Sequence, residues 1–240
     1  MLLNKTSKYP EFKNLLSALK ENNIDYERDL NSVMKNVNRR ELGERFTLDE
    51  HIEGLVYALL SSQRPWEPIE QNRSKINSIF HNFDSDYLEM INPDDLVADI
   101  KEIKCGNRRI SSQIRELKDN ILTLKKIAEE YGSIDSFYDG KTAEELTELL
   151  SDPKSKYKLK GLGRSLAALY LKNMGILTEK PDIHTTRIIG LWGYSKNSPK
   201  PATKDETHKV CLEIARAYGI SVVEVDLIIW KGGESGVAYQ

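Results

Sequence analysis

The sequence predicts an all-α fold, and three observations support this. Apolar residues recur at spacings of three and four along most of the 240-residue chain, as they do on one face of a helix. Strand signals are scarce, because even the β-branched run at residues 222–225 returns to a helical pattern. No repeat, low-complexity tract or long Gly/Ser linker interrupts the pattern. With 39% apolar and 30% charged residues, the composition is that of an ordinary globular protein.

A helix start and the most apolar run of the chain lie at residues 47–62. Thr47 followed by Glu50 matches a capping box, which predicts the start of a helix. The run 51–62 is the most apolar in the chain and predicts a buried central helix. The other expected helices cover residues 11–21, 29–36, 69–80, 93–100, 109–131, 142–150, 162–174, 183–192, 204–218 and 222–230.

The bulk properties exclude several classes of protein. The two cysteines, Cys105 and Cys211, are too few and too far apart for a disulfide framework or a Cys-rich metal site. His208 and Cys211 have a metal-like spacing but lack further partners, so no metal site is expected. The chain shows no signal-peptide pattern and no apolar stretch of about 18 residues. We therefore expect a cytoplasmic protein without a membrane partner.

A glycine hairpin at Gly161-Leu162-Gly163 is the most informative motif. Two glycines one residue apart allow a tight turn that a Cβ would obstruct. The backbone N–H groups of such a turn, together with the start of the next helix, suit a phosphate group. We expect Leu162 to point inward, and the small residues Ala167 and Ala168 to allow close helix packing. The alternative is an ordinary helix connection with a glycine C-cap.

Basic residues precede and follow this hairpin. Five of them fall within eleven positions, and the only acid nearby in sequence is Asp152; they are Lys154, Lys156, Lys158, Lys160 and Arg164. A formal net charge of −2 argues mildly against a nucleic-acid binder, but binding depends on local charge. The segment therefore predicts phosphate contacts, and the alternative is a solvated charged face.

An acidic residue, Asp182, lies nineteen positions beyond Gly163 and just before an expected helix. A structural role as the N-cap of that helix is the simpler interpretation. A carboxylate near a phosphate-binding hairpin can also stabilise the positive charge that builds on a sugar when its N-glycosidic bond breaks. Both roles remain open on these residues alone.

In these features the chain resembles the helix-hairpin-helix DNA glycosylase superfamily, which includes endonuclease III and the adenine glycosylases. The family's hairpin pattern matches Leu159 to Arg164, and its later Asp-x-His-x-x-Arg-like segment matches Asp182, His184 and Arg187. A third match upstream is Leu59 to Gln63, where the family places a glutamine that enters the DNA near the extruded base. The similarity covers roughly residues 48–230.

The resemblance implies a base-flipping enzyme of base excision repair that binds double-stranded DNA containing a damaged or modified base. Asp182 is then the catalytic carboxylate. The residues expected at the DNA are Gln63, Arg64, Lys158, Lys160, Gly161, Gly163, Arg164, Ser165 and His184. The implied fold has two helical domains with a cleft between them: residues 48–176 form a helical barrel that ends in the helix-hairpin-helix, and residues 1–47 with 177–240 form the second domain. We expect a monomer.

Three departures from the family pattern refine this expectation. Ser165 stands where bifunctional members carry the lysine that attacks the sugar, which favours a monofunctional enzyme that uses water. Two distant cysteines cannot hold the iron-sulfur cluster of many relatives, so none is expected, and a monovalent cation at the hairpin stays open. Ala58 replaces the acid of adenine-excising relatives, which disfavours adenine excision.

Three alternatives remain at this point. A lysine outside the expected position gives the chain lyase activity as well. A non-enzymatic helix-hairpin-helix module recognises DNA structure without releasing a base. A helical adaptor binds other proteins, and the basic segment is then a solvated face. The sequence does not identify the excised base.

Overall fold

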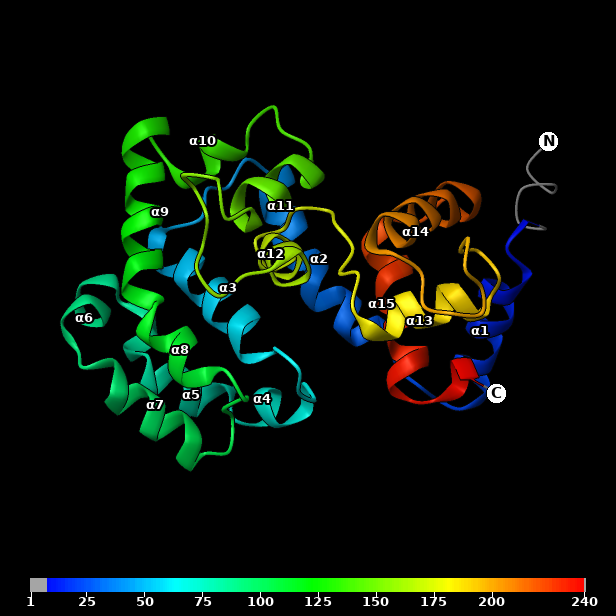
Figure 1. Ribbon diagram of the computed structural model, residues 1–240, viewed down its shortest axis with the longest axis horizontal. Helices are drawn as coiled ribbons and strands as arrows, with labels where there is room; N and C mark the ends of the chain where they lie inside the picture. The colour runs from blue at the N-terminus through cyan, green and yellow to red at the C-terminus, as the bar shows by residue number, and fades with distance from the viewer. Residues whose placement is uncertain (1–7, 240) are drawn as a thin grey trace. The chain divides into compact units, whose positions relative to one another are not determined.

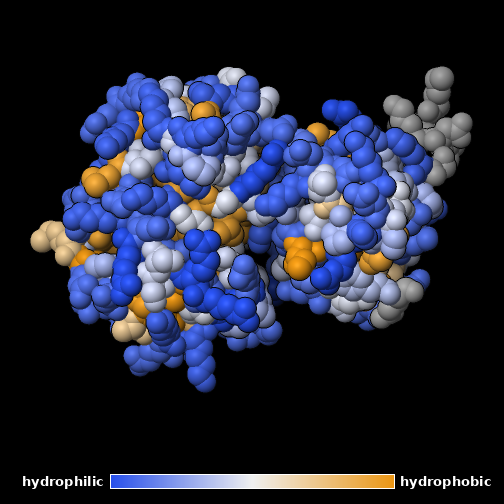
Figure 2. All heavy atoms as spheres, in the orientation of Figure 1, coloured by the Kyte–Doolittle hydropathy of each residue, from blue (hydrophilic) through white to orange (hydrophobic). Residues whose placement is uncertain are grey.

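The computed structural model describes residues 8–239, and within them every regular element is a helix (Figure 1), which confirms the predicted all-α class. The predicted second domain includes residues 1–7 and 240, which lie outside the described part. The chain divides into two compact units: residues 39–176, and residues 1–38 with 177–240. No helix among residues 8–239 is long and apolar enough to cross a membrane. Hydrophilic residues cover most of the visible face of each unit (Figure 2).

The unit of residues 39–176 is built around α3 (Leu48–Leu60), whose side chains from Leu55 to Leu60 are almost completely buried. Thr47 and Glu50 form the predicted capping box at its start. This helix contacts α12, η2, α6, α8 and α9. The other helices of the unit are α4 (Glu67–Gln71), α5 (Arg73–Ile79), η2 (His81–Phe83), α6 (Ser85–Met90), α7 (Pro93–Glu102), α8 (Ile110–Arg115), α9 (Leu117–Tyr131), α10 (Ile134–Tyr138), α11 (Ala143–Ser151) and α12 (Arg164–Asn173).

The other unit has its own hydrophobic core, separate from that of the first. Its helices are α1 (Pro10–Glu21), α13 (Ile183–Leu191), α14 (Lys204–Tyr218), α15 (Val222–Glu234) and η3 (Val237–Tyr239), while α2 (Glu27–Glu41) continues across the division. Phe12 of α1, Ile188 of α13 and Ile228 of α15 are fully buried in this core. The β-branched run at residues 222–225 starts α15, because Ser221 caps the helix and its apolar side chains face the core.

Of the two predicted domain boundaries, the one between residues 176 and 177 coincides with the division of the chain, whereas the other lies elsewhere. The prediction placed it between residues 47 and 48, whereas the units divide between Asn38 and Arg39. The reason is a set of contacts that only the fold brings together. Arg40 binds the buried carboxylate of Asp135 at 2.6 Å, and the same carboxylate accepts a hydrogen bond from the N–H of Phe46 at 2.5 Å.

Two predicted helices are each divided in the structure. The range 69–80 is interrupted at Asn72, whose side chain donates to the carbonyl of Pro68, and the range 109–131 is interrupted at Glu116. Two short helices, α6 and α10, were missed because five or six residues are too few to show a period. The predicted helix 162–174 begins only at Arg164, because Gly163 is its extended N-cap residue.

A buried polar network in the unit of residues 39–176 joins α3, α10, α12 and the end of α2, which carries Arg40. His51 of α3 contacts the hydroxyl of Tyr170 of α12 at 2.8 Å, and Tyr138 of α10 donates to the same hydroxyl at 3.0 Å. Asp135 of α10 lies 3.7 Å from His51 Nε2 and pairs with Arg40, which also donates to the carbonyl of Met174 at the end of α12. The network therefore fixes the helix that follows the glycine hairpin.

Candidate active site

The hairpin connects α11 to α12, which pack against each other. The N–H of Leu162 donates to the carbonyl of Leu159 at 3.2 Å and closes the turn. Gly161 has φ +79°, in the left-handed region, and Gly163 is extended at the start of α12. Leu162, Ala167 and Ala168 are buried, as predicted. Among residues 8–239, the N–H groups of Gly161 and Gly163 have no hydrogen-bond partner, so they are available to an anion.

Polar side chains of α8 and α9 support the hairpin from beneath. The amide of the buried Asn120 donates to the carbonyl of Lys160 at 3.0 Å and accepts from the N–H of Lys160 at 2.6 Å. Gln113 is also buried, and its Cγ would lie 3.4 Å from a Cβ at Gly161. Sequence reasoning missed both residues. The available signal was two amides seven positions apart on a helical pattern, which places both on one face.

If the hairpin binds DNA as the sequence predicts, Gly161→Ala weakens duplex binding about tenfold. It also lowers stability by about 1–2 kcal/mol, the cost of a left-handed non-glycine residue. The new Cβ would also lie 3.2 Å from Leu59 Cδ2, so the Leu59 side chain must move by a few tenths of an ångström. Gly140→Ala is the matched control: Gly140 has φ +74° but open space around it, so it loses stability without losing affinity. Chemical denaturation and fluorescence anisotropy with a labelled duplex separate the two effects. Equal affinity losses in both variants would contradict this role of the hairpin.

The basic residues around the hairpin are paired with acids that the sequence alone did not place there. Lys160 binds Asp119 at 2.6 Å, Lys156 binds Glu130 at 2.7 Å and Arg164 binds Glu144 at 2.7 Å. The pairing raises the pKa of Lys160. These pairs are largely exposed, and such pairs contribute only about 0–1 kcal/mol each, so a phosphate can replace the carboxylate. The positive charge of this segment is therefore more fully balanced by nearby carboxylates than the sequence suggested.

The two residues predicted at the end of the central helix differ in their surroundings. Gln63 is exposed, has a left-handed φ of 54° and makes no side-chain hydrogen bond within residues 8–239. A non-glycine residue in this conformation costs about 1–2 kcal/mol, and five other non-glycine residues of the described chain share it, so the backbone alone does not mark a functional position. Arg64 instead donates to the carbonyls of Gly106 and Lys104, both at 2.8 Å. A DNA contact by either residue stays a prediction.

Asp182 belongs to the unit of residues 1–38 and 177–240, where it caps α13. Its Oδ1 accepts from the N–H groups of His184 at 2.9 Å and Thr185 at 3.1 Å, as the N-cap interpretation predicted. Within residues 8–239 its Oδ2 accepts no hydrogen bond. One oxygen therefore fixes the carboxylate while the other stays available for chemistry. His184 lies 3.4 Å from the Tyr239 hydroxyl and packs directly on Gly233, where a Cβ would approach within 2.7 Å.

Comparison with known proteins finds similarity to DNA glycosylases. No protein-family model matches the chain. An 8-oxoguanine DNA glycosylase/AP lyase from Aquifex aeolicus is 34% identical to this chain over 93 residues, which make up 38% of the chain. The match spans 41% of that relative's length, which is less than half.

Two solved structures share the fold over most of their length. The 8-oxoguanine DNA glycosylase of Thermotoga maritima aligns with a TM-score of 0.62 over 91% of this chain and 93% of its own, at 18% identity. The Methanocaldococcus jannaschii 8-oxoguanine glycosylase/lyase, solved with a 15mer DNA containing 8-oxoguanine, aligns with a TM-score of 0.59 over 92% and 97%, also at 18% identity. These comparisons confirm the predicted resemblance to the helix-hairpin-helix DNA glycosylases.

Proposed function

We propose that this chain is a DNA glycosylase of base excision repair, a hydrolase that removes a damaged base by cleaving its N-glycosidic bond. The observation that carries the proposal is the hairpin before α12, where the N–H groups of Gly161 and Gly163 have no hydrogen-bond partner among residues 8–239 and Asn120 holds the turn in place. Such an arrangement binds a phosphate of the DNA backbone without reading its sequence. Flipping one nucleotide out of the duplex then exposes its sugar and base to the enzyme.

The chemistry is assigned to Asp182. As the base departs, positive charge develops on the sugar, and a carboxylate held in a fixed position stabilises it. The backbone N–H groups of α13 hold Oδ1 in place, whereas Oδ2 accepts no hydrogen bond among residues 8–239. Oδ2 therefore suits this role and can also accept a proton from the attacking water. Water adds to the sugar carbon, and the bond to the base breaks with the electron pair leaving on the base.

8-Oxoguanine is the first substrate to test, since the relatives named above carry that activity. The experiment is a screen of base release by mass spectrometry across duplexes that contain 8-oxoguanine, uracil, a thymine mismatch, an alkylated base or a modified cytosine. We expect free 8-oxoguanine to accumulate fastest. Binding to these duplexes without release of any base would instead support a non-enzymatic helix-hairpin-helix module.

The enzyme is proposed to be monofunctional because Ser165, in the first turn of α12, cannot form a Schiff base with the sugar. The prediction is that borohydride added during the reaction traps no covalent protein–DNA adduct, even though the base is released. Ser165→Lys, which supplies an amine at this position, is the positive control for trapping. An adduct formed by the natural chain would contradict the proposal and would favour the glycosylase/lyase activity that two of the relatives are named for.

A further inference from the structure

Lys158 differs from the other basic residues around the hairpin in the direction of its side chain. Its ammonium group donates a hydrogen bond to the carbonyl oxygen of Leu162, inside the turn. Lys156 and Lys160 instead reach outward to carboxylates on the surface. Burial lowers the pKa of Lys158, and the nearby Glu116 and Asp152 offset only part of this effect. Lys158 is therefore a partly dehydrated cation within the hairpin, although the sequence suggested a DNA contact for it.

The Leu162 carbonyl and the Gly163 N–H belong to one planar peptide group, so they point in opposite directions. The N–H has no partner within residues 8–239 and is available to a phosphate, while the carbonyl oxygen meets the ammonium of Lys158. A charge-assisted hydrogen bond at one end of a peptide polarises it and strengthens the donor at the other end. This contact gives Lys158 a route through the backbone to a phosphate bound at the Gly163 N–H.

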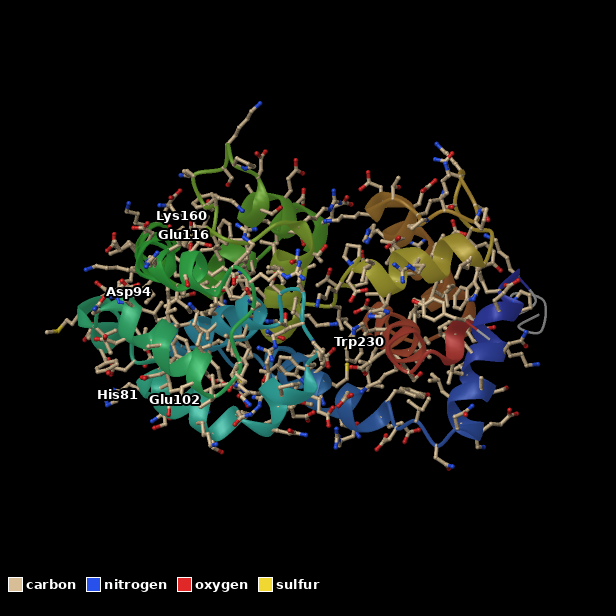
Figure 3. All side chains as sticks on the ribbon, turned by 60° about the horizontal axis from the view of Figure 1, so that its bottom comes forward. His81, Asp94, Glu102, Glu116, Lys160 and Trp230 are labelled. Atoms are coloured by element: carbon tan, nitrogen blue, oxygen red, sulfur yellow. The ribbon has the colours of Figure 1, made fainter. Side chains whose placement is uncertain are left out.

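An acidic side chain, Glu116, also lies close to the hairpin. Glu116 Oε2 is buried, has no hydrogen-bond partner among the described residues, and would lie 3.5 Å from a Cβ at Gly161. Figure 3 shows Glu116 next to Lys160 of the hairpin, and its charge acts on both Lys158 and Lys160. Glu116 is half-buried as a residue, and a cation close to its buried oxygen stabilises the carboxylate charge.

We propose that Lys158 is the resident cation of the hairpin: its ammonium group occupies the carbonyl side of the turn, where a monovalent metal ion would otherwise sit, and Glu116 is its counter-charge. The residues present do not fit a metal ion at this place, because the ammonium group already fills it and a second cation would be repelled. The consequence is that DNA binding by this chain does not depend on which monovalent cation is in solution.

The test compares duplex affinity in potassium, sodium and choline chloride at equal ionic strength, using a duplex with a non-cleavable abasic analogue. The natural chain is expected to bind equally well in all three, within about twofold. Lys158→Met is expected to lose about tenfold in choline, the effect of one charge-assisted hydrogen bond, and to recover most of it in potassium or sodium, which enter the vacated place. Lys154→Met is the matched control, because it removes the charge of an exposed lysine of the same loop. It is expected to lose a similar small factor in every salt.

A second readout needs no DNA and so does not rest on the proposed function. The melting temperature of Lys158→Met is expected to be higher in potassium than in choline, whereas that of the natural chain is the same in both. In Lys158→Met/Glu116→Gln this potassium effect disappears, because the counter-charge is gone. An equal loss of affinity by Lys158→Met in all three salts, or a natural chain that itself responds to potassium, would overturn the proposal. A natural chain that binds no duplex in any salt would count against the proposed function, and the melting experiment would still decide the role of Lys158.

Discussion

Replacing Asp182 by Asn is expected to slow base release by about 10³-fold, the scale of losing one preorganised electrostatic group at a transition state. Asn keeps the side-chain oxygen that accepts from the N–H groups of His184 and Thr185, so α13 keeps its cap. It lacks the negative charge that stabilises the sugar and the basicity that activates water. Single-turnover base release measures the loss, and anisotropy with the same duplex should give an affinity close to that of the natural chain.

Two controls separate chemistry from folding. Asp84→Asn makes the same change at another N-cap, at the start of α6, and should leave base release unchanged. Asp182→Ala removes both the charge and the cap, so it should lose about 1 kcal/mol of stability in addition to activity. If Asp182→Asn released base at more than about a tenth of the natural rate, the catalytic role of Asp182 would be wrong and only its role as a cap would remain.

Arg40→Met is expected to destabilise the unit 39–176 by about 3–5 kcal/mol, because it leaves a buried charge without its partner. Asp135 is completely buried, and Arg40 binds it at 2.6 Å. Burial raises the pKa of Asp135, but the neighbouring His51, the N–H of Phe46 and the Arg40 guanidinium outweigh it and hold the pKa at about 2. Urea denaturation at neutral pH measures the loss of stability. The substitution should also weaken DNA binding, since Arg40 donates a hydrogen bond to the carbonyl of Met174 at the end of α12.

The pH dependence of this loss provides its internal check. In the natural chain the depressed pKa of Asp135 contributes stability that is present above about pH 4 and is lost as the pH falls toward 2. Without the guanidinium, burial favours the protonated carboxyl, so the penalty of Arg40→Met should shrink as the pH approaches 4. Arg45→Met removes an exposed pair with Asp139 at 3.4 Å and should cost less than about 1 kcal/mol at any pH. Equal penalties in the two variants would contradict the buried-charge argument.

The features that the sequence predicted correctly depend on neighbours in the chain. The capping box at Thr47, the cap at Asp182 and the inward Leu162 each follow from residues within three or four positions of one another. The features it missed join distant segments. Asn120 supports Lys160 across 40 positions, and Asp135 pairs with Arg40 across 95. Such contacts depend on how the helices pack, which local periodicity does not specify.

The hairpin shows the same contrast within a few residues. The glycines predicted the turn, but they could not distinguish the inward Lys158 from the outward Lys160, since both are lysines two positions apart in one loop. The two lysines differ in burial, since Lys158 is half-buried whereas Lys160 is exposed. The acids that pair with the basic segment, such as Asp119 and Glu144, lie on α9 and α11 and were invisible to a charge count along the chain.

The central claim is that the chain removes a base and leaves the strand intact, and one measurement tests it most directly. An end-labelled duplex with a single 8-oxoguanine is incubated with the natural chain, and half of each sample is heated in alkali before denaturing electrophoresis. The account predicts a strand break at the lesion only in the alkali-treated half, because hydrolysis leaves an alkali-labile abasic site. A break in the untreated half, or no break in either, would contradict it.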